Sequence, residues 1–203
     1  MRKIIYITLG LIFLFTSFLQ AGETSLLEIQ ENDFIIGDEN APITIIEYAS
    51  MSCSHCASFH NNTLEDVKTE YIDTGKVRFV FRDFPFDYPA LLGSMMMRCI
   101  PEDFRYDYMN ALYILQKDWV VRENATTKKE LYKIMQTGGM TKEEFDSCLS
   151  DVDLENEILE GVLGAQKEFN IKSTPSFLIN GNLVEGNKNI KEFRQIIDKI
   201  LSE

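Results

Sequence analysis

Two thiols stand three positions apart in the run Cys53, Ser54, His55 and Cys56. Cysteines at this spacing can close a small redox-active disulfide, supply half of a zinc site, or form a structural staple. A run rich in β-branched residues, 43–48, precedes them, and a stretch typical of a helix follows from Ser54 to about Asp73. We therefore expect Cys53 at a strand-to-helix junction, a position that favours thiol-disulfide exchange.

At the N-terminus of a helix, free backbone amides and the helix dipole stabilise an anion, so Cys53 is the expected nucleophile. The dipole supplies up to about 2 kcal/mol, which lowers a thiol pKa by at most about 1.5, so a strongly acidic thiol needs further hydrogen bonds. His55 is the natural source of these. Cys56, inside the first helical turn, is the expected resolving thiol. The alternative is a static disulfide between the two cysteines.

A carboxylate, Glu47, stands in the middle of the apolar strand that leads to the motif. An unpaired buried carboxylate is costly, so we expect Glu47 to be paired, or to have a raised pKa and relay a proton to Cys56. An ion pair with a neighbour such as Arg82 is the alternative to the relay. His60, one turn beyond Cys56, is interpreted as a surface or packing residue of the helix rather than a metal ligand.

Residues 1–21 have the layout of a secretory signal peptide. Arg2 and Lys3 precede an apolar run of 16 residues from Ile4 to Leu19, and cleavage is expected after Ala21. The run is short for a membrane span, and an uncleaved signal anchor is the alternative. The net charge of −12 becomes −14 when the two basic residues are removed, which argues against nucleic acid or an anionic membrane as the main partner.

Export to an oxidising compartment allows disulfides to persist, and all four cysteines lie after the predicted signal. Cys99 and Cys148 each end an apolar helical stretch, 49 positions apart. We expect them to be bonded to each other, with a stabilisation of about 4 kcal/mol from the loss of chain entropy. Two buried, inert thiols are the alternative.

At 203 residues, the chain fits one domain or a domain with a sizeable insertion. Five segments have the composition of strands: 34–36, 43–48, 77–83, 176–180 and 183–185. Gly181 and Asn182 are expected to form the hairpin turn between the last two. A helix with one apolar face is expected at 190–201.

The segment 84–172 between the third and fourth of these strands has a mostly helical pattern. Pro89 marks one helix start, and capping boxes are expected at Thr127 with Glu130 and at Thr141 with Glu144. Another helix is expected at 154–169, and the two glycines after Thr137 should end the one before it. The layout is a β-α-β unit, a helical insertion, and a β-β-α unit.

Cys53-Ser54-His55-Cys56 after a strand, Glu47 six residues before Cys53, and Thr174-Pro175 at the start of a later strand together resemble the DsbA family of exported thiol-disulfide oxidoreductases. The resemblance implies an α/β, thioredoxin-like fold with an inserted α-helical domain. The thioredoxin-like domain would comprise 22–83 and 173–203, and the α-helical insertion 84–172. The sequence departs from the best-known member at Ser54, where that protein has proline, and at Thr174, where it has valine.

In the family, Pro175 would be cis and lie beside the CxxC motif, and Thr174 and Pro175 would bind an extended substrate. The resemblance also supports the proton-relay role of Glu47. It implies a periplasmic protein that introduces disulfides into reduced or unfolded exported proteins through Cys53 and Cys56. A DsbB-like membrane oxidase would reoxidise it, and no metal or organic cofactor is implied.

Three other functions remain open. A disulfide isomerase or reductase of the same superfamily is the nearest, and Thr174 before Pro175 mildly favours it. Dimeric isomerases of this superfamily carry a separate N-terminal dimerisation domain, which residues 22–41 are too short to supply, so we expect a monomer. A metal-binding module would need a non-local ligand, since the chain has only 2 histidines and no second CxxC. A redox-inactive binding protein is disfavoured by the intact CxxC.

Overall fold

The computed structural model describes residues 25–203, and the predicted signal peptide at 1–21 lies outside the described residues. A five-stranded sheet has the strand order β1-β3-β2-β4-β5, in which only the β2–β3 pair is parallel. Its strands are β1 (Phe34–Ile36), β2 (Ile43–Ala49), β3 (Val77–Asp83), β4 (Ser176–Ile179) and β5 (Asn182–Glu185). The predicted α/β class and all five predicted strands are confirmed.

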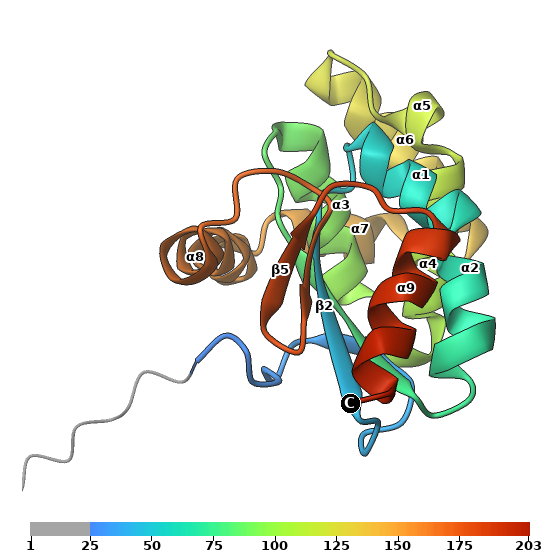
Figure 1. Cartoon of the computed structure of the whole chain (residues 1–203). Helices are drawn as coiled ribbons and strands as arrows, with labels where there is room; N and C mark the ends of the chain where they lie inside the picture. Colours follow the sequence, from blue (N-terminus) through green and yellow to red (C-terminus); the bar gives the residue numbers. More distant parts are fainter. Residues whose placement is uncertain (1–24) are drawn as a thin grey trace, which may run out of the picture.

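The helices lie on both faces of this sheet (Figure 1). In chain order they are α1 (Ser54–Asn62), α2 (Leu64–Val67), the π-helical turn η1 (Lys68–Ile72), α3 (Tyr88–Cys99), α4 (Glu102–Ile114), α5 (Gln116–Trp119), α6 (Asn124–Thr137), α7 (Lys142–Leu149), α8 (Val152–Phe169) and α9 (Ile190–Leu201). The six helices from α3 to α8 all come between β3 and β4. Among the described residues, no helix combines the length and apolar character required to cross a membrane.

Alternating side chains of β2 serve two separate cores, because successive residues of a strand point to opposite faces of the sheet. Ile46 and Tyr48 pack with Ala165 of α8 on one face. Ile43 and Ile45 point to the other face, where α1, α2 and α9 lie (Figure 1). Glu47 shares this second face by alternation, so the strand directs its carboxylate toward α1.

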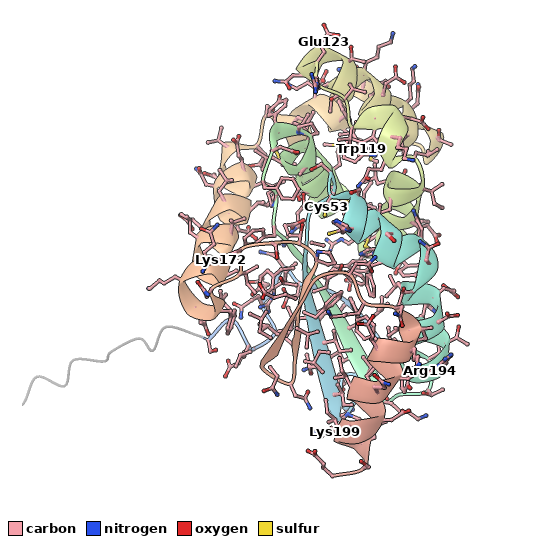
Figure 2. The ribbon with its side chains drawn as sticks, turned by 45° about the horizontal axis from the view of Figure 1, so that its top comes forward. Cys53, Trp119, Glu123, Lys172, Arg194 and Lys199 are labelled. Atoms are coloured by element: carbon pink, nitrogen blue, oxygen red, sulfur yellow. A yellow bond between two sulfur atoms is a disulfide. The ribbon has the colours of Figure 1, made fainter. Side chains whose placement is uncertain are left out.

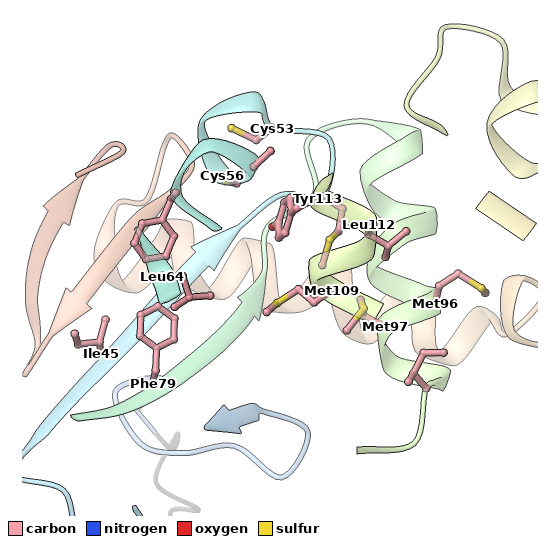
Figure 3. Close-up of a cluster of buried hydrophobic side chains, with 14 of the residues drawn as sticks. Ile45, Cys53, Cys56, Leu64, Phe79, Met96, Met97, Met109, Leu112 and Tyr113 are labelled. Carbon is pink, nitrogen blue, oxygen red and sulfur yellow. The ribbon is translucent and has the colours of Figure 1, made fainter. Parts of the chain in front are cut away.

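The core on the α1 face continues into the helices that follow β3. Met96 and Met97 of α3 and Met109 and Leu112 of α4 are buried together beside the CxxC end of α1 (Figure 3). A disulfide joins Cys99, the exposed last residue of α3, to the buried Cys148 of α7. The helices between β3 and β4 therefore pack directly against the elements that carry the motif.

Two of the predictions about the helices differ from the structure. The helix expected from Ser54 to Asp73 is broken at Thr63, where the backbone leaves the helical conformation. The capping box expected at Thr127 is wrong, because α6 begins a turn earlier, at Asn124, and the Thr127 hydroxyl donates to the carbonyl of Val121. The box of Thr141 with Glu144 is confirmed.

The hairpin between β4 and β5 turns at Asn180 and Gly181 rather than at Gly181 and Asn182. Asn182 already pairs with Ile179 in the ladder. Both turn residues have positive φ, 45° for Asn180 and 81° for Gly181, as an Asn-Gly hairpin turn requires. The predicted turn lies one residue too far along the chain, because both Asn-Gly and Gly-Asn are turn signals.

Candidate active site

Cys53 is the N-cap residue of α1, directly after the loop that leaves β2. Its thiol is mostly buried, and Sγ donates to the carbonyl oxygen of Thr174 at 3.3 Å. Figure 2 shows Cys53 near Trp119 of α5. Cys56 lies in the first turn of α1 and is fully buried, and neither thiol is in a disulfide. The strand-to-helix junction predicted for Cys53 is therefore present.

The pKa of Cys53 is lowered from 9.0 to about 5. The largest cause is a hydrogen bond from the Cys56 thiol, which outweighs the opposing effect of burial. Contact with Thr174 and the backbone amides of Cys56 and His55 lower it further. The contribution of His55 therefore comes from its backbone, and its side chain is exposed. The hydrogen bonds expected from the imidazole stay a prediction, because the largest cause of the lowered pKa of Cys53 is the second thiol.

The pKa of Cys56 is raised far above its ordinary value. Burial is the main cause, since a thiolate in an apolar environment loses its solvation. The hydrogen bond to Cys53 and the negative charge of Glu47 act in the same direction. The two thiols of one motif thus have opposite tendencies: Cys53 favours the thiolate and Cys56 the thiol.

Glu47 is fully buried, and its Oε2 lies 2.9 Å from Nε2 of His60, one turn after Cys56 on α1. The alternative, an ion pair between Glu47 and Arg82, is not formed, because the Arg82 guanidinium makes a bidentate ion pair with Asp33. His60 was interpreted as a surface or packing residue. It is buried, but it is also the polar partner of Glu47.

The ring of Tyr113, on α4, stacks on the imidazole of His60 with a centroid separation of 4.1 Å and an interplanar angle of 28°. Figure 3 shows Tyr113 directed from α4 toward the start of α1, beside Cys56. Burial and the nearby charge of Glu47 raise the pKa of Tyr113, so its hydroxyl stays protonated. The site below Cys56 therefore contains a carboxylate, an imidazole and a phenol, all buried.

The peptide bond between Thr174 and Pro175 is cis, and both residues are buried beside Cys53. The Thr174 carbonyl accepts from the Cys53 thiol. The Thr174 hydroxyl is buried without a hydrogen-bond partner among the described residues. It can therefore donate to Cys53 once the thiol ionises. Within residues 25–203, no cluster of three or more histidine, cysteine or acidic side chains is arranged to hold a metal ion.

This geometry agrees with the comparisons with known proteins. The Thioredoxin family model matches residues 30–199. A protein of Rickettsia bellii named as a protein-disulfide oxidoreductase is 32% identical over 177 residues, which cover 87% of this chain and 67% of that protein. The crystal structure of alpha-DsbA1 from Wolbachia pipientis superposes with a TM-score of 0.81 at 31% identity, covering 87% of this chain and 94% of that one. The chain belongs to the DsbA family of thiol-disulfide oxidoreductases.

The predicted DsbA resemblance and thioredoxin-like fold are thereby confirmed. BdbD from Bacillus subtilis shares the fold with a TM-score of 0.74 at 20% identity, over 85% of this chain. The chain spans 67% of the length of the Rickettsia bellii relative and 63% of a Rickettsia conorii one. The DsbA family membership rests on the part of those relatives that the chain matches.

Two further side chains position the motif of this DsbA-family protein, and neither was a predicted site residue. Gln116 of α5 is buried and donates through Nε2 to the carbonyl oxygens of Met51 and Cys53, each at 3.0 Å. Asp87, the N-cap of α3, accepts from the Ser52 hydroxyl at 2.8 Å. Each residue lies at a helix start in the segment after β3, and only their distance from Cys53 in space reveals the role.

Proposed function

We propose that this protein is a disulfide oxidase that transfers the Cys53–Cys56 disulfide to thiols of exported proteins. The observation that carries the proposal is the opposite ionisation of the two thiols, with the pKa of Cys53 lowered to about 5 and that of Cys56 raised. A stabilised Cys53 thiolate is a good leaving group and favours the reduced enzyme, so the disulfide is readily given away.

The reaction has two exchange steps. A substrate thiolate attacks Sγ of Cys53 in the enzyme disulfide, the S–S bond to Cys56 breaks, and Cys56 leaves as a thiolate that takes up a proton. The second substrate thiolate then attacks the substrate sulfur of the mixed disulfide, and Cys53 leaves as a thiolate. The substrate loses two electrons and the enzyme gains them.

Glu47 is proposed to exchange the proton with Cys56. Its carboxylate is fully buried on the sheet face that carries α1, and its charge acts on the Cys56 thiol. Because the Cys56 thiolate is strongly disfavoured, a proton must arrive as the disulfide opens and must leave before the disulfide forms again. A buried carboxylate is suited to this exchange, since bulk water does not reach Cys56.

The lowered pKa of Cys53 determines how much more oxidising the enzyme becomes. At pH 7, a Cys53 pKa of about 5 instead of 9.0 stabilises the reduced form by about 3 kcal/mol. For a two-electron couple, this corresponds to about 60 mV toward a more oxidising enzyme. A reductase needs the opposite bias, so the lowered pKa supports oxidation of substrates over their reduction.

Exposed apolar side chains flank the residues that hold the motif, and they support binding of unfolded chains. Phe86 and Tyr88 stand on either side of Asp87, and Ile114 and Leu115 precede Gln116. Unfolded proteins expose apolar segments that such a rim can contact. We propose that Thr174 and Pro175 bind the extended backbone of the substrate next to Cys53, as the family resemblance implies.

The proposed setting is the periplasm, reached through the signal peptide predicted at 1–21. Reoxidation is proposed to use a DsbB-like membrane oxidase, which accepts electrons from the reduced Cys53–Cys56 pair. We propose a monomer, which light scattering on the purified protein measures directly.

Two assays separate oxidation from isomerisation. The oxidised protein should rapidly oxidise a reduced peptide with two cysteines and should rescue scrambled ribonuclease poorly. A redox titration against glutathione gives the potential in the same preparation. A dimer that rescues scrambled ribonuclease efficiently would overturn the oxidase proposal in favour of the isomerase.

Trapping tests the roles of the two thiols. Cys56→Ser should accumulate mixed disulfides with exported proteins, because Cys53 still attacks and the resolving thiol is absent. Cys53→Ser is the matched control and should accumulate none on non-reducing gels. Equal trapping by both variants would contradict the assigned roles.

A further inference from the structure

We propose that His60 is a positioning residue that carries the Cys56 proton between Glu47 and an internal cavity. This inference deepens the proposed function and rests on it, since only a resolving Cys56 needs the route. Glu47 alone cannot complete the proton exchange, because Cys56 and Glu47 are both 0% exposed. A proton that reaches Glu47 therefore needs a second group to connect it with solvent.

The geometry of the Glu47–His60 pair fits this task. Each group uses one atom in the 2.9 Å contact, Oε2 of Glu47 and Nε2 of His60. The other atom of each group, Oε1 of Glu47 and Nδ1 of His60, is buried without a hydrogen-bond partner among the described residues. A buried polar atom without a partner costs free energy, so a structural pair would normally satisfy both. The free atoms leave one acceptor and one ring nitrogen available for proton transfer.

The imidazole is held in place by aromatic rings. Tyr113 stacks on it from α4, and the Phe81 ring of β3 lies 5.7 Å away between centroids. These contacts restrict rotation of the imidazole and keep Nε2 on Glu47. An imidazole can accept a proton at one nitrogen and release one from the other.

A small cavity adjoins His60 and Tyr113. It has a volume of about 40 Å³, enough for about two water molecules. Its lining includes groups near the surface, since the side chains of Arg98 and Asp83 are 20% and 15% exposed. His60 lines this cavity but its Nδ1 is buried, so the outward step of the proposed route requires a local opening that brings water to Nδ1.

The charges that face His60 come from four elements. Glu47 of β2 is its direct partner, and Tyr113 of α4 stays neutral. The cavity wall carries Arg82 and Asp83 of β3, Arg98 of α3, and Arg105 of α4. Arg82 is paired with Asp33 and Arg98 with Asp83, so two of the three arginine charges at the cavity wall are offset by carboxylates.

During reoxidation, Cys53 has attacked a disulfide of the partner and is held in a mixed disulfide with it, and Cys56 is a thiol. Cys56 gives its proton to the Glu47–His60 pair, its thiolate attacks Sγ of Cys53, and the partner sulfur leaves as a thiolate. The pair then holds one extra proton, which leaves from Nδ1 of His60 to water in the cavity.

The test separates the two exchange steps. Reduced protein is mixed with oxidised glutathione, quenched with acid at successive times, and analysed by mass spectrometry. The Cys53–glutathione adduct first forms and is then lost when Cys56 attacks. His60→Gln retains an N–H that can donate to Glu47 but cannot pass on a proton. We expect it to form the adduct at the wild-type rate and to resolve it at least about tenfold more slowly at pH 7.

The pH dependence of the resolution rate shows whether loss of the proton route causes the slower resolution. Resolution by the wild type should depend weakly on pH between 6 and 8, whereas His60→Gln and Glu47→Gln should both accelerate steeply with rising pH, because hydroxide must replace the internal route. The double variant should be no slower than Glu47→Gln alone. Tyr71→Phe, which removes a partly buried hydrogen bond to Asp198, is the control for lost stability and should resolve normally.

If His60→Gln resolved the adduct at the wild-type rate and with an unchanged pH profile, the proposal would be overturned. Equal slowing of adduct formation and resolution would also overturn it, since that indicates a structural role. If the variants do not fold, the wild-type resolution rate in mixtures of H₂O and D₂O decides: a curved dependence supports two protons in motion, and a linear one contradicts the route. Failure of the proposed function looks different, because the wild type would then form no adduct at Cys53.

Discussion

A hydrogen bond between the two thiols and the burial of Cys56 distinguish the two cysteines of the motif. Cys56 donates to Cys53, and this contact lowers the pKa of one thiol while it raises that of the other. Burial, the largest effect on Cys56, keeps the proton on the inner sulfur, whereas the backbone amides of Cys56 and His55 stabilise the thiolate of the outer one.

Cys56→Ala should therefore raise the pKa of Cys53 from about 5 toward its ordinary value, because the leading donor is lost. Cys56→Ser is the matched comparison, since its hydroxyl can still donate, and its Cys53 pKa should stay closer to that of the wild type. Thiolate absorbance against pH measures both variants. Equal values in the two would show that the inner thiol is not the donor that matters.

Thr174→Val should also raise the pKa of Cys53, by removing the unpartnered hydroxyl that can donate to the thiolate. The carbonyl of residue 174 remains, so substrate exchange should continue with a less oxidising potential. The glutathione equilibrium of the variant reports this change. A potential equal to that of the wild type would exclude the hydroxyl as a donor.

At the level of elements, the segment between β3 and β4 determines the position of the motif. Gln116 of α5 binds two carbonyls of the motif loop, and Asp87 of α3 binds Ser52 in the same loop. Gly93 of α3 allows the close approach, since a Cβ there would lie 2.8 Å from Cβ of Met51 and 2.9 Å from Cη2 of Trp119. The helices after β3 are thus part of the active-site framework.

The Cys99–Cys148 disulfide joins α3 to α7 within this framework. Replacing both cysteines with alanine should lower stability by about 4 kcal/mol, the chain-entropy value for a loop of this length. Oxidase activity at 25 °C should fall much less, because the bridge contacts neither Cys53 nor its donors. Thermal unfolding and peptide oxidation on the same preparation make the comparison. Activity lost in step with stability would place the bridge in the catalytic framework.

At the scale of the whole molecule, the lowered pKa of Cys53 links redox state to folding stability. A group with a depressed folded pKa stabilises the folded state above its unfolded pKa, and this stabilisation is lost as the pH falls through the folded pKa. The window for Cys53 runs from about 9.0 down to about 5. Cys56, with its raised pKa, remains a thiol throughout and contributes nothing there. The disulfide form has no thiolate and lacks the effect.

The stability of the reduced protein relative to the oxidised protein should therefore decrease by about 3 kcal/mol between pH 7 and pH 4. Chemical denaturation of both forms at a series of pH values measures the difference. Taking the difference cancels the titration of groups common to both forms. A difference that is independent of pH would contradict the lowered pKa.

The amino-acid sequence by itself determined the strands, most helix positions and the two reactive thiols. Strand alternation, an apolar helix face and a CxxC after a strand depend on residues a few positions apart, so local patterns suffice to predict them. They also identified Glu47 as a buried carboxylate that needs an explanation.

Only the tertiary structure determined which side chains pair with the residues of the site. Glu47 could have paired with any nearby cation, and the rotation of α1 on the sheet selected His60 and left Arg82 to Asp33. Gln116 acts on Cys53 from 63 positions away, which no local pattern records. The physical reason is that side-chain pairing depends on how packed elements are rotated and spaced, and that packing is set by the whole core at once.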